Sequence, residues 1–108
     1  MNTDMSATNT SAQFDKYIGE AKPLLVEFYN PECSKCLETL PQLEQLKREF
    51  GPRANVMAVD GHAEAALRET YKIDTYPTYI LFKDGKVAWR DSGRKDTPEL
   101  RHMVEDFI

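Results

Sequence analysis

Short apolar runs alternate with amphipathic stretches along this chain in a regular order. The apolar runs predict strands at 24–29, 55–60, 78–82 and 87–90, the one at 55–60 being a buried strand. Elsewhere apolar residues recur every three or four positions, which predicts helices: a short one carrying residues 14–18, a long one from the first cysteine to about 50, and two more at 63–71 and from 97 onward. The order of these elements is helix, then β-α-β-α-β-β-α.

Turn and cap residues fix how these elements connect. Asp84-Gly85 lies between two strand-like runs, and this pair favours a two-residue type I′ hairpin turn. Thr97-Pro98 predicts a helix start with Thr97 as the cap and Pro98 in the first turn. Strand–helix–strand units imply parallel pairing, whereas the hairpin implies antiparallel pairing. The chain is therefore predicted to be an α/β protein, with a central mixed sheet of four or five strands flanked by four helices.

Length and composition place limits on the class of protein. A chain of 108 residues, 41% of them hydrophobic, is expected to form a single domain over 1–108. Residues 1–9 are polar and are expected to be loosely ordered or to form a short edge strand near 5–8. The net charge is −4 with both signs interspersed, so nothing in the sequence resembles a basic footprint for nucleic acid. No apolar stretch approaches membrane-spanning length. With no secretory signal at the start, we expect a cytoplasmic monomer without nucleic-acid or membrane partners.

Cys33 and Cys36 are the only cysteines, and they lie where a strand meets a helix. A helix N-terminus favours a thiolate, and a second thiol one turn on is the minimal equipment for thiol–disulfide exchange. A structural disulfide closing so short a loop would contribute only about 2 kcal/mol. A metal site is the other interpretation of this spacing, but two thiolates leave zinc short of four ligands. His62 and His102 lack ligand spacing with the cysteines, so we expect no metal.

An ordered set of motifs accompanies the two cysteines. The set comprises Cys33-x-x-Cys36, Pro41 within the following helix, Tyr76-Pro77-Thr78 before a strand, Glu27 six residues before Cys33, the Asp84-Gly85 hairpin and Gly93. Together these residues resemble the thioredoxin family over about 14–108. The resemblance implies the thioredoxin fold and an enzyme that reduces or exchanges disulfides of partner proteins. It also implies that no bound cofactor is needed, because a separate reductase supplies the electrons.

The resemblance also implies roles for individual residues. Cys33 would be the nucleophile that attacks a substrate disulfide, and Cys36 the resolving thiol. Pro77 would be a cis-proline packed against the disulfide, leaving Tyr76 to offer its backbone to an extended substrate chain. Gly93 would supply a turn beside the same groove.

Glu27 interrupts an otherwise apolar strand, and two positions fit it. Strand alternation allows a solvated face of an edge strand. The resemblance instead favours a buried acid beneath the resolving cysteine, where desolvation raises the pKa of Glu27 and fits it for proton transfer. A lysine that often neighbours this acid in the family is replaced here by Val56.

The residues around the cysteines depart from the family pattern of Trp-Cys-Gly-Pro-Cys. Glu32 places a negative charge beside the thiolate, Lys35 a positive one, and Ser34 replaces glycine. These three residues are candidates for tuning the reduction potential, although they could equally be solvated residues with no redox consequence. The loss of the aromatic residue also keeps open a second function, a non-enzymatic module that binds a protein partner.

Overall fold

The computed structural model describes residues 10–108, so the short strand predicted near 5–8 lies outside the described residues. The elements are α2 (Thr10–Ile18), β1 (Leu24–Tyr29), α3 (Ser34–Phe50), the single 3-10 turn η1 (Gly51–Arg53), β2 (Asn55–Asp60), α4 (Ala65–Thr70), β3 (Thr78–Lys83), β4 (Lys86–Ser92) and α5 (Thr97–Glu105). The predicted order of helices and strands is confirmed. The helix predicted at 63–71 is shorter than expected: it begins at Ala65 and ends at Thr70.

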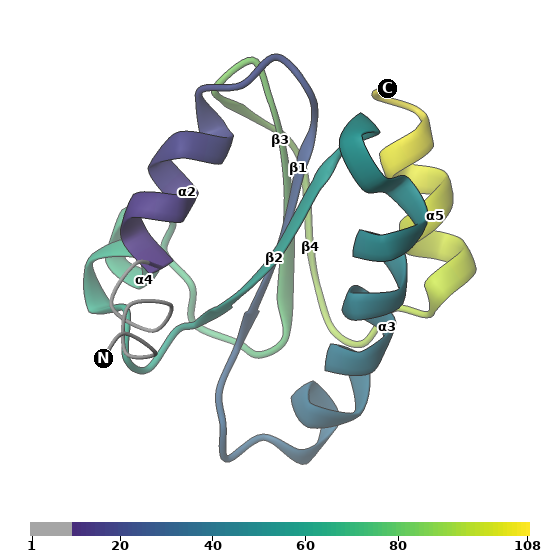
Figure 1. The fold of residues 1–108 in the computed structure, drawn as a ribbon. Helices are drawn as coiled ribbons and strands as arrows, with labels where there is room; N and C mark the ends of the chain where they lie inside the picture. Colours follow the sequence, from purple (N-terminus) through teal and green to yellow (C-terminus); the bar gives the residue numbers. More distant parts are fainter. Residues whose placement is uncertain (1–9) are drawn as a thin grey trace, which may run out of the picture.

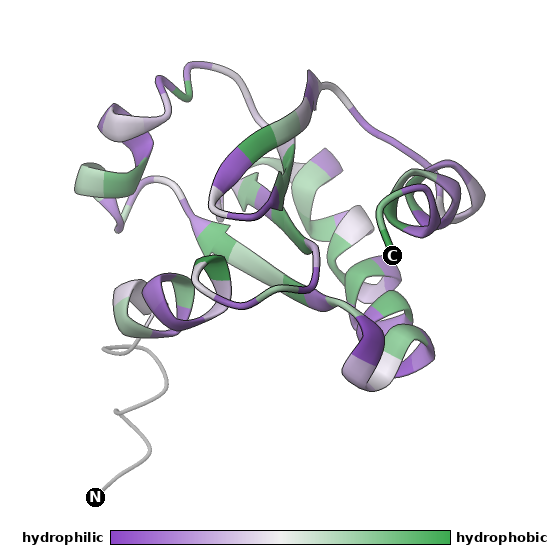
Figure 2. Ribbon diagram, turned by 90° about the horizontal axis from the view of Figure 1, so that it is seen from above, coloured by the Kyte–Doolittle hydropathy of each residue, from purple (hydrophilic) through white to green (hydrophobic). Residues whose placement is uncertain are grey.

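The strands form one mixed sheet in the order β2-β1-β3-β4. β1 pairs in parallel with β2, while the β1–β3 and β3–β4 pairs are antiparallel. Helices α3 and α5 cover one face of the sheet, and α2 and α4 cover the other (Figure 1). The two faces carry separate core clusters, and the strands between the helices are mostly hydrophobic (Figure 2).

Strand alternation decides which side chains reach which cluster. Leu25, Tyr79 and Leu81 face α3 and α5, whereas Val26, Phe28 and Ile80 face α2 and α4. β1 lies between β2 and β3, so both of its faces are buried, as expected for a strand covered by helices on both sides. A polar residue at any of the first five positions of β1 is therefore held away from water.

The turn between β3 and β4 has the predicted geometry. Asp84 and Gly85 have φ values of 55° and 78°, and a type I′ turn requires positive φ at both central positions. The predicted cap of α5 was wrong. Asp96 is the cap, because its carboxylate accepts a hydrogen bond from the Glu99 amide at 3.0 Å, while the Thr97 hydroxyl donates to Gln42 at 2.7 Å. Across residues 10–108, no helix has the length and apolarity needed to cross a bilayer.

Candidate active site

Cys33 lies at the N-terminus of α3, at the end of a loop shaped by Asn30. The Cys33 amide donates to the Asn30 carbonyl at 2.9 Å, and the Glu32 amide donates to the Asn30 side chain at 2.9 Å. Cys33 is the residue that caps α3: its Sγ accepts a hydrogen bond from the Cys36 amide at 3.2 Å. A negative charge on this sulfur is stabilised by that amide and by the helix dipole.

Cys36 lies one turn further along α3 and is fully buried, whereas Cys33 is half-buried. Both thiols are free. Burial raises the pKa of Cys36 to about 11, and the neighbouring Cys33 sulfur and the Glu27 charge act in the same direction. Cys36 is therefore held as a thiol while Cys33 is the more accessible sulfur.

Glu27 is buried in the middle of β1 with no exposed surface, so the interpretation as a solvated edge-strand residue was wrong. Its Oε2 accepts a hydrogen bond from the Thr39 hydroxyl at 2.6 Å. Burial raises the pKa of Glu27 to about 7, although the Thr39 bond opposes that rise. Tyr79 lies directly opposite on β3, and burial and the Glu27 charge raise the pKa of Tyr79 to about 12.

Glu27 carries little compensation for its burial. Among residues 10–108, neither Glu27 Oε1 nor the Tyr79 hydroxyl has a hydrogen-bond partner. Val56, which stands where the family often has a lysine, is buried in the apolar cluster on the same face. The carboxyl group is thus stabilised by a hydroxyl donor rather than by a cation.

The segment before β3 lies at the same end of the sheet as the cysteine loop. The Tyr76–Pro77 peptide bond is cis. Strand register pairs Phe28 with Thr78 and Thr78 with Ser92, which brings the residue before β3 and the residue after β4 to the end where β1 leads into the cysteine loop. The Gly93 amide donates to the Pro77 carbonyl at 2.9 Å, and Gly93 has a φ of 95° that favours glycine.

Glu32, Ser34 and Lys35 are all exposed around the cysteines. Within the described part of the chain, no ion pair involves Glu32 or Lys35. Arg94, near Gly93, forms an exposed ion pair with Glu38 on α3 at 3.2 Å. Solvent screens such exposed charges, which weakens their effect on the Cys33 sulfur.

Sequence reasoning missed Thr39, Tyr79 and Gly61 as parts of this site. Thr39 is a polar residue in the otherwise apolar buried stripe of α3, and Tyr79 is two residues from the cis-proline on the face that Glu27 shares. Gly61 leaves space for Tyr76: a Cβ at position 61 would lie 2.6 Å from the Tyr76 ring. A polar residue at helical spacing from Cys36 was the one signal in the sequence that pointed to Thr39.

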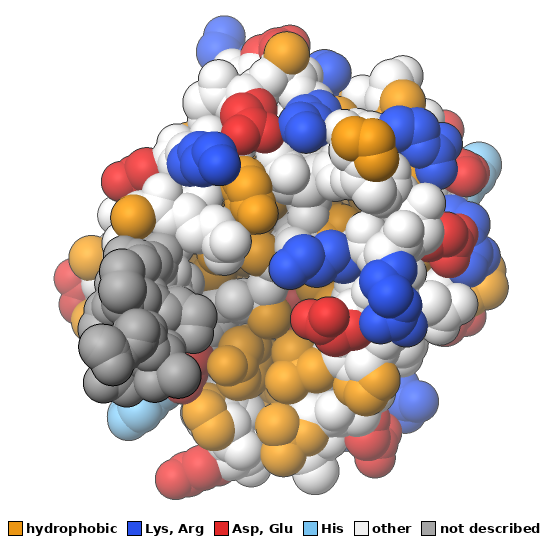
Figure 3. Space-filling model, viewed as in Figure 1, with side chains coloured by type: hydrophobic (Ala, Val, Ile, Leu, Met, Phe, Trp, Pro, Cys, Tyr) orange, Lys and Arg blue, Asp and Glu red, His pale blue; other side chains and the backbone are white. Residues whose placement is uncertain are grey.

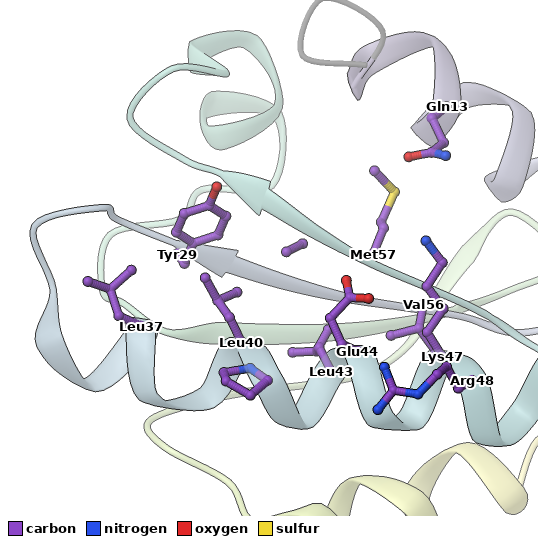
Figure 4. Close-up of a pocket in the computed structure, with 12 residues that line it drawn as sticks. Gln13, Tyr29, Leu37, Leu40, Leu43, Glu44, Lys47, Arg48, Val56 and Met57 are labelled. Atoms are coloured by element: carbon purple, nitrogen blue, oxygen red, sulfur yellow. The ribbon is translucent and has the colours of Figure 1, made fainter. Parts of the chain in front are cut away.

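A hollow on the described surface lies away from the cysteines. It has a volume of about 690 Å³ and runs between α3 and β2, with Gln13 of α2 at its far side (Figure 4). Hydrophobic side chains gather in it, and basic and acidic side chains border it (Figure 3). One end reaches Tyr29 and Leu37, but neither cysteine lines it. Among residues 10–108, no cluster of histidine, cysteine and carboxylate side chains could hold a metal ion.

Comparison with known proteins places the geometry in a family. The thioredoxin family model matches residues 5–106. A chloroplastic thioredoxin Y of Oryza sativa is 30% identical over 92% of this chain, which spans 60% of that relative. A thioredoxin-like protein of Synechocystis is 31% identical, with 83% of this chain and 86% of that protein covered. The structure of Fasciola hepatica thioredoxin covers 91% of this chain and 94% of its own at 26% identity, with a TM-score of 0.81.

These matches define the fold as the thioredoxin fold, as predicted. The chain belongs to the thioredoxin family, whose members are disulfide oxidoreductases.

Proposed function

We propose that this chain is a thiol–disulfide oxidoreductase that reduces or exchanges disulfides of partner proteins through Cys33 and Cys36. The arrangement of the two sulfurs carries the proposal. The half-buried Cys33 sulfur accepts a hydrogen bond from the Cys36 amide at the α3 N-terminus, and the Cys36 thiol lies buried one helical turn further along. Membership of a family of disulfide oxidoreductases supports the same reaction.

The reaction has two exchange steps. The Cys33 thiolate attacks one sulfur of the substrate disulfide, forming a mixed disulfide and releasing the other substrate sulfur as a thiolate. Cys36 then loses its proton and attacks the Cys33 sulfur, which closes the Cys33–Cys36 disulfide and releases the second substrate thiolate. The substrate gains two electrons, and a separate reductase returns two electrons to the chain.

Glu27 is our candidate for the group that accepts the Cys36 proton. With a pKa of about 7, Glu27 is partly ionised at neutral pH, as a general base requires. Transfer from Cys36 would be unfavourable in the resting protein because the pKa of Cys36 is about 11. The mixed disulfide removes the Cys33 charge that helps to raise the pKa of Cys36. Proton transfer is therefore less unfavourable after substrate has been captured than in the resting protein, although burial still raises the pKa of Cys36.

Tyr76, Pro77 and Gly93 are proposed to bind the substrate chain beside Cys33. Two observations support this role: the three residues lie at the same end of the sheet as the cysteine loop, and the Gly93 amide donates a hydrogen bond of 2.9 Å to the Pro77 carbonyl. We further propose that Glu32, Ser34 and Lys35 tune the reduction potential. A value near about −270 mV suits a general reductant and one near about −120 mV suits an oxidant. The cytoplasmic location and the monomeric state remain predictions.

Insulin reduction tests the proposed reaction, with dithiothreitol as the electron source. Cys33→Ser should reduce turnover to the dithiothreitol background, because serine cannot form the mixed disulfide. Gln45→Ala, which changes an exposed residue of α3, should retain the full rate. Equal rates for the wild type and Cys33→Ser would refute the reaction. A partner that binds equally well without either cysteine, in the absence of turnover, would instead favour the partner-binding module.

A further inference from the structure

Three buried oxygen atoms form a continuous series between β1 and α3. The Thr39 Oγ lies 2.6 Å from Glu27 Oε2 and 2.8 Å from the main-chain oxygen of Cys36. Both Glu27 and Thr39 have no exposed surface. Each distance is within the range of an O–H···O hydrogen bond. The two contacts therefore link the buried acid to the helical turn that carries the resolving thiol.

The number of available hydrogens depends on the charge of Glu27. A threonine hydroxyl carries a single hydrogen, and a carbonyl oxygen and a carboxylate can only accept. When Glu27 is ionised, Thr39 has one hydrogen for two acceptors, so one of the two contacts is unmade. When Glu27 is protonated, its O–H donates to the Thr39 oxygen and Thr39 donates to the Cys36 carbonyl. Only the protonated acid satisfies both contacts at once.

We propose that Thr39 is a positioning residue whose hydroxyl hydrogen moves between the Cys36 carbonyl and the Glu27 carboxylate as Glu27 gains or loses its proton. The proposal deepens the proposed function and rests on it, since Glu27 there receives the Cys36 proton. Protonating Glu27 frees the Thr39 hydrogen to return to the Cys36 carbonyl. The arrival of the proton is thus coupled to the first turn of α3.

Among the groups around Glu27, the Thr39 hydroxyl is the main one that stabilises its carboxylate. Cys36 faces it from α3, Tyr79 from β3 and Tyr29 from its own strand, and Asp60 on β2 adds negative charge beside Tyr29. All of these groups are neutral or negative, and none supplies a positive charge. Within residues 10–108, the Thr39 hydroxyl makes the one geometrically formed hydrogen bond to the Glu27 carboxyl.

Carbon-13 NMR titration of the reduced protein tests the coupling without any turnover. The Glu27 carboxyl carbon and the Cys36 carbonyl carbon should titrate with one shared midpoint. In Glu27→Gln, the Cys36 carbonyl should lose that transition, and any remaining titration belongs to the thiols. A Cys36 carbonyl that ignores the Glu27 midpoint in the wild type would overturn the proposal, even if Thr39 variants failed to fold.

Two substitutions separate the hydroxyl from the shape of the side chain. Thr39→Val keeps the branched shape but removes the hydroxyl, so the Glu27 pKa should rise by about one unit, a tenfold change in proton affinity. The reason is that an unpaired buried charge costs more than an unpaired buried carboxylic acid. Thr39→Ser restores the hydroxyl and should restore the wild-type midpoint.

The outcomes distinguish this proposal from the proposed function. An unchanged or lowered Glu27 midpoint in Thr39→Val would overturn the role of Thr39, whatever the insulin assay gives. A midpoint that rises equally in Thr39→Ser would assign the effect to packing and would also overturn it. If the wild-type protein did not reduce insulin but the Glu27 and Cys36 carbons still shared one midpoint, the result would support the positioning role of Thr39 and refute only the proposed reaction.

Discussion

Replacing Glu27 with glutamine should remove a dependence of stability on pH. The Glu27 pKa is about 7 in the folded protein, against an ordinary value of 4.5. Because the folded state holds the proton more tightly, Glu27 contributes stability below pH 4.5 that is lost as the pH rises through 7. A difference of about two and a half pKa units corresponds to about 3 kcal/mol at 1.36 kcal/mol per unit.

Urea unfolding of the reduced protein at pH 5, 6, 7 and 8 measures this effect. The free energy of unfolding of the wild type minus that of Glu27→Gln should fall by about 2.5 kcal/mol from pH 5 to pH 8. Other titrating groups cancel in that difference. Glu44→Gln, which changes an exposed residue of α3, should give a difference that does not depend on pH. Parallel pH profiles for the wild type and Glu27→Gln would refute the reasoning.

Two further predictions concern local packing and capping. Gly61→Ala should destabilise the protein by about 1 kcal/mol in urea unfolding, because the new Cβ would lie 2.6 Å from the Tyr76 ring and the Tyr76 side chain would have to move. Gly19→Ala is the control, because its Cβ would meet its nearest atoms at 3.7 Å. Equal losses of stability in the two variants would contradict the claim that Gly61 leaves space for the Tyr76 ring. Asp96→Ala should cost about 1 kcal/mol because the Glu99 amide loses its acceptor. An unchanged unfolding midpoint would exclude Asp96 as a significant cap.

Features with a local cause could be predicted from the sequence. The hairpin depends on Asp84 and Gly85 alone, since these two residues tolerate positive φ. The position of Cys33 at the start of α3 follows from a strand-like run, a turn and a helical pattern in immediate succession. The thioredoxin fold came from the resemblance of an ordered set of motifs, which the solved structures confirm.

Features that depend on contacts between distant segments could not be predicted in this way. The alternation of side chains along β1 does not predict whether Glu27 is buried, because helices bury both faces of that strand. Thr39 acquires its importance from the position of Glu27 across the α3–sheet interface. The cap of α5 was misassigned because Asp96 and Thr97 are both good capping residues, and Thr97 instead bonds to Gln42 on α3.

Trapping of the mixed disulfide tests most directly the central claim that Cys33 attacks and Cys36 resolves. Cys36→Ser and Cys33→Ser would each be incubated with a disulfide-bonded protein, quenched with an alkylating agent and analysed by mass spectrometry. Cys36→Ser should accumulate a covalent complex through Cys33 that dithiothreitol releases, and Cys33→Ser should form little. Equal complexes from the two variants, or a complex formed only through Cys36, would contradict the account.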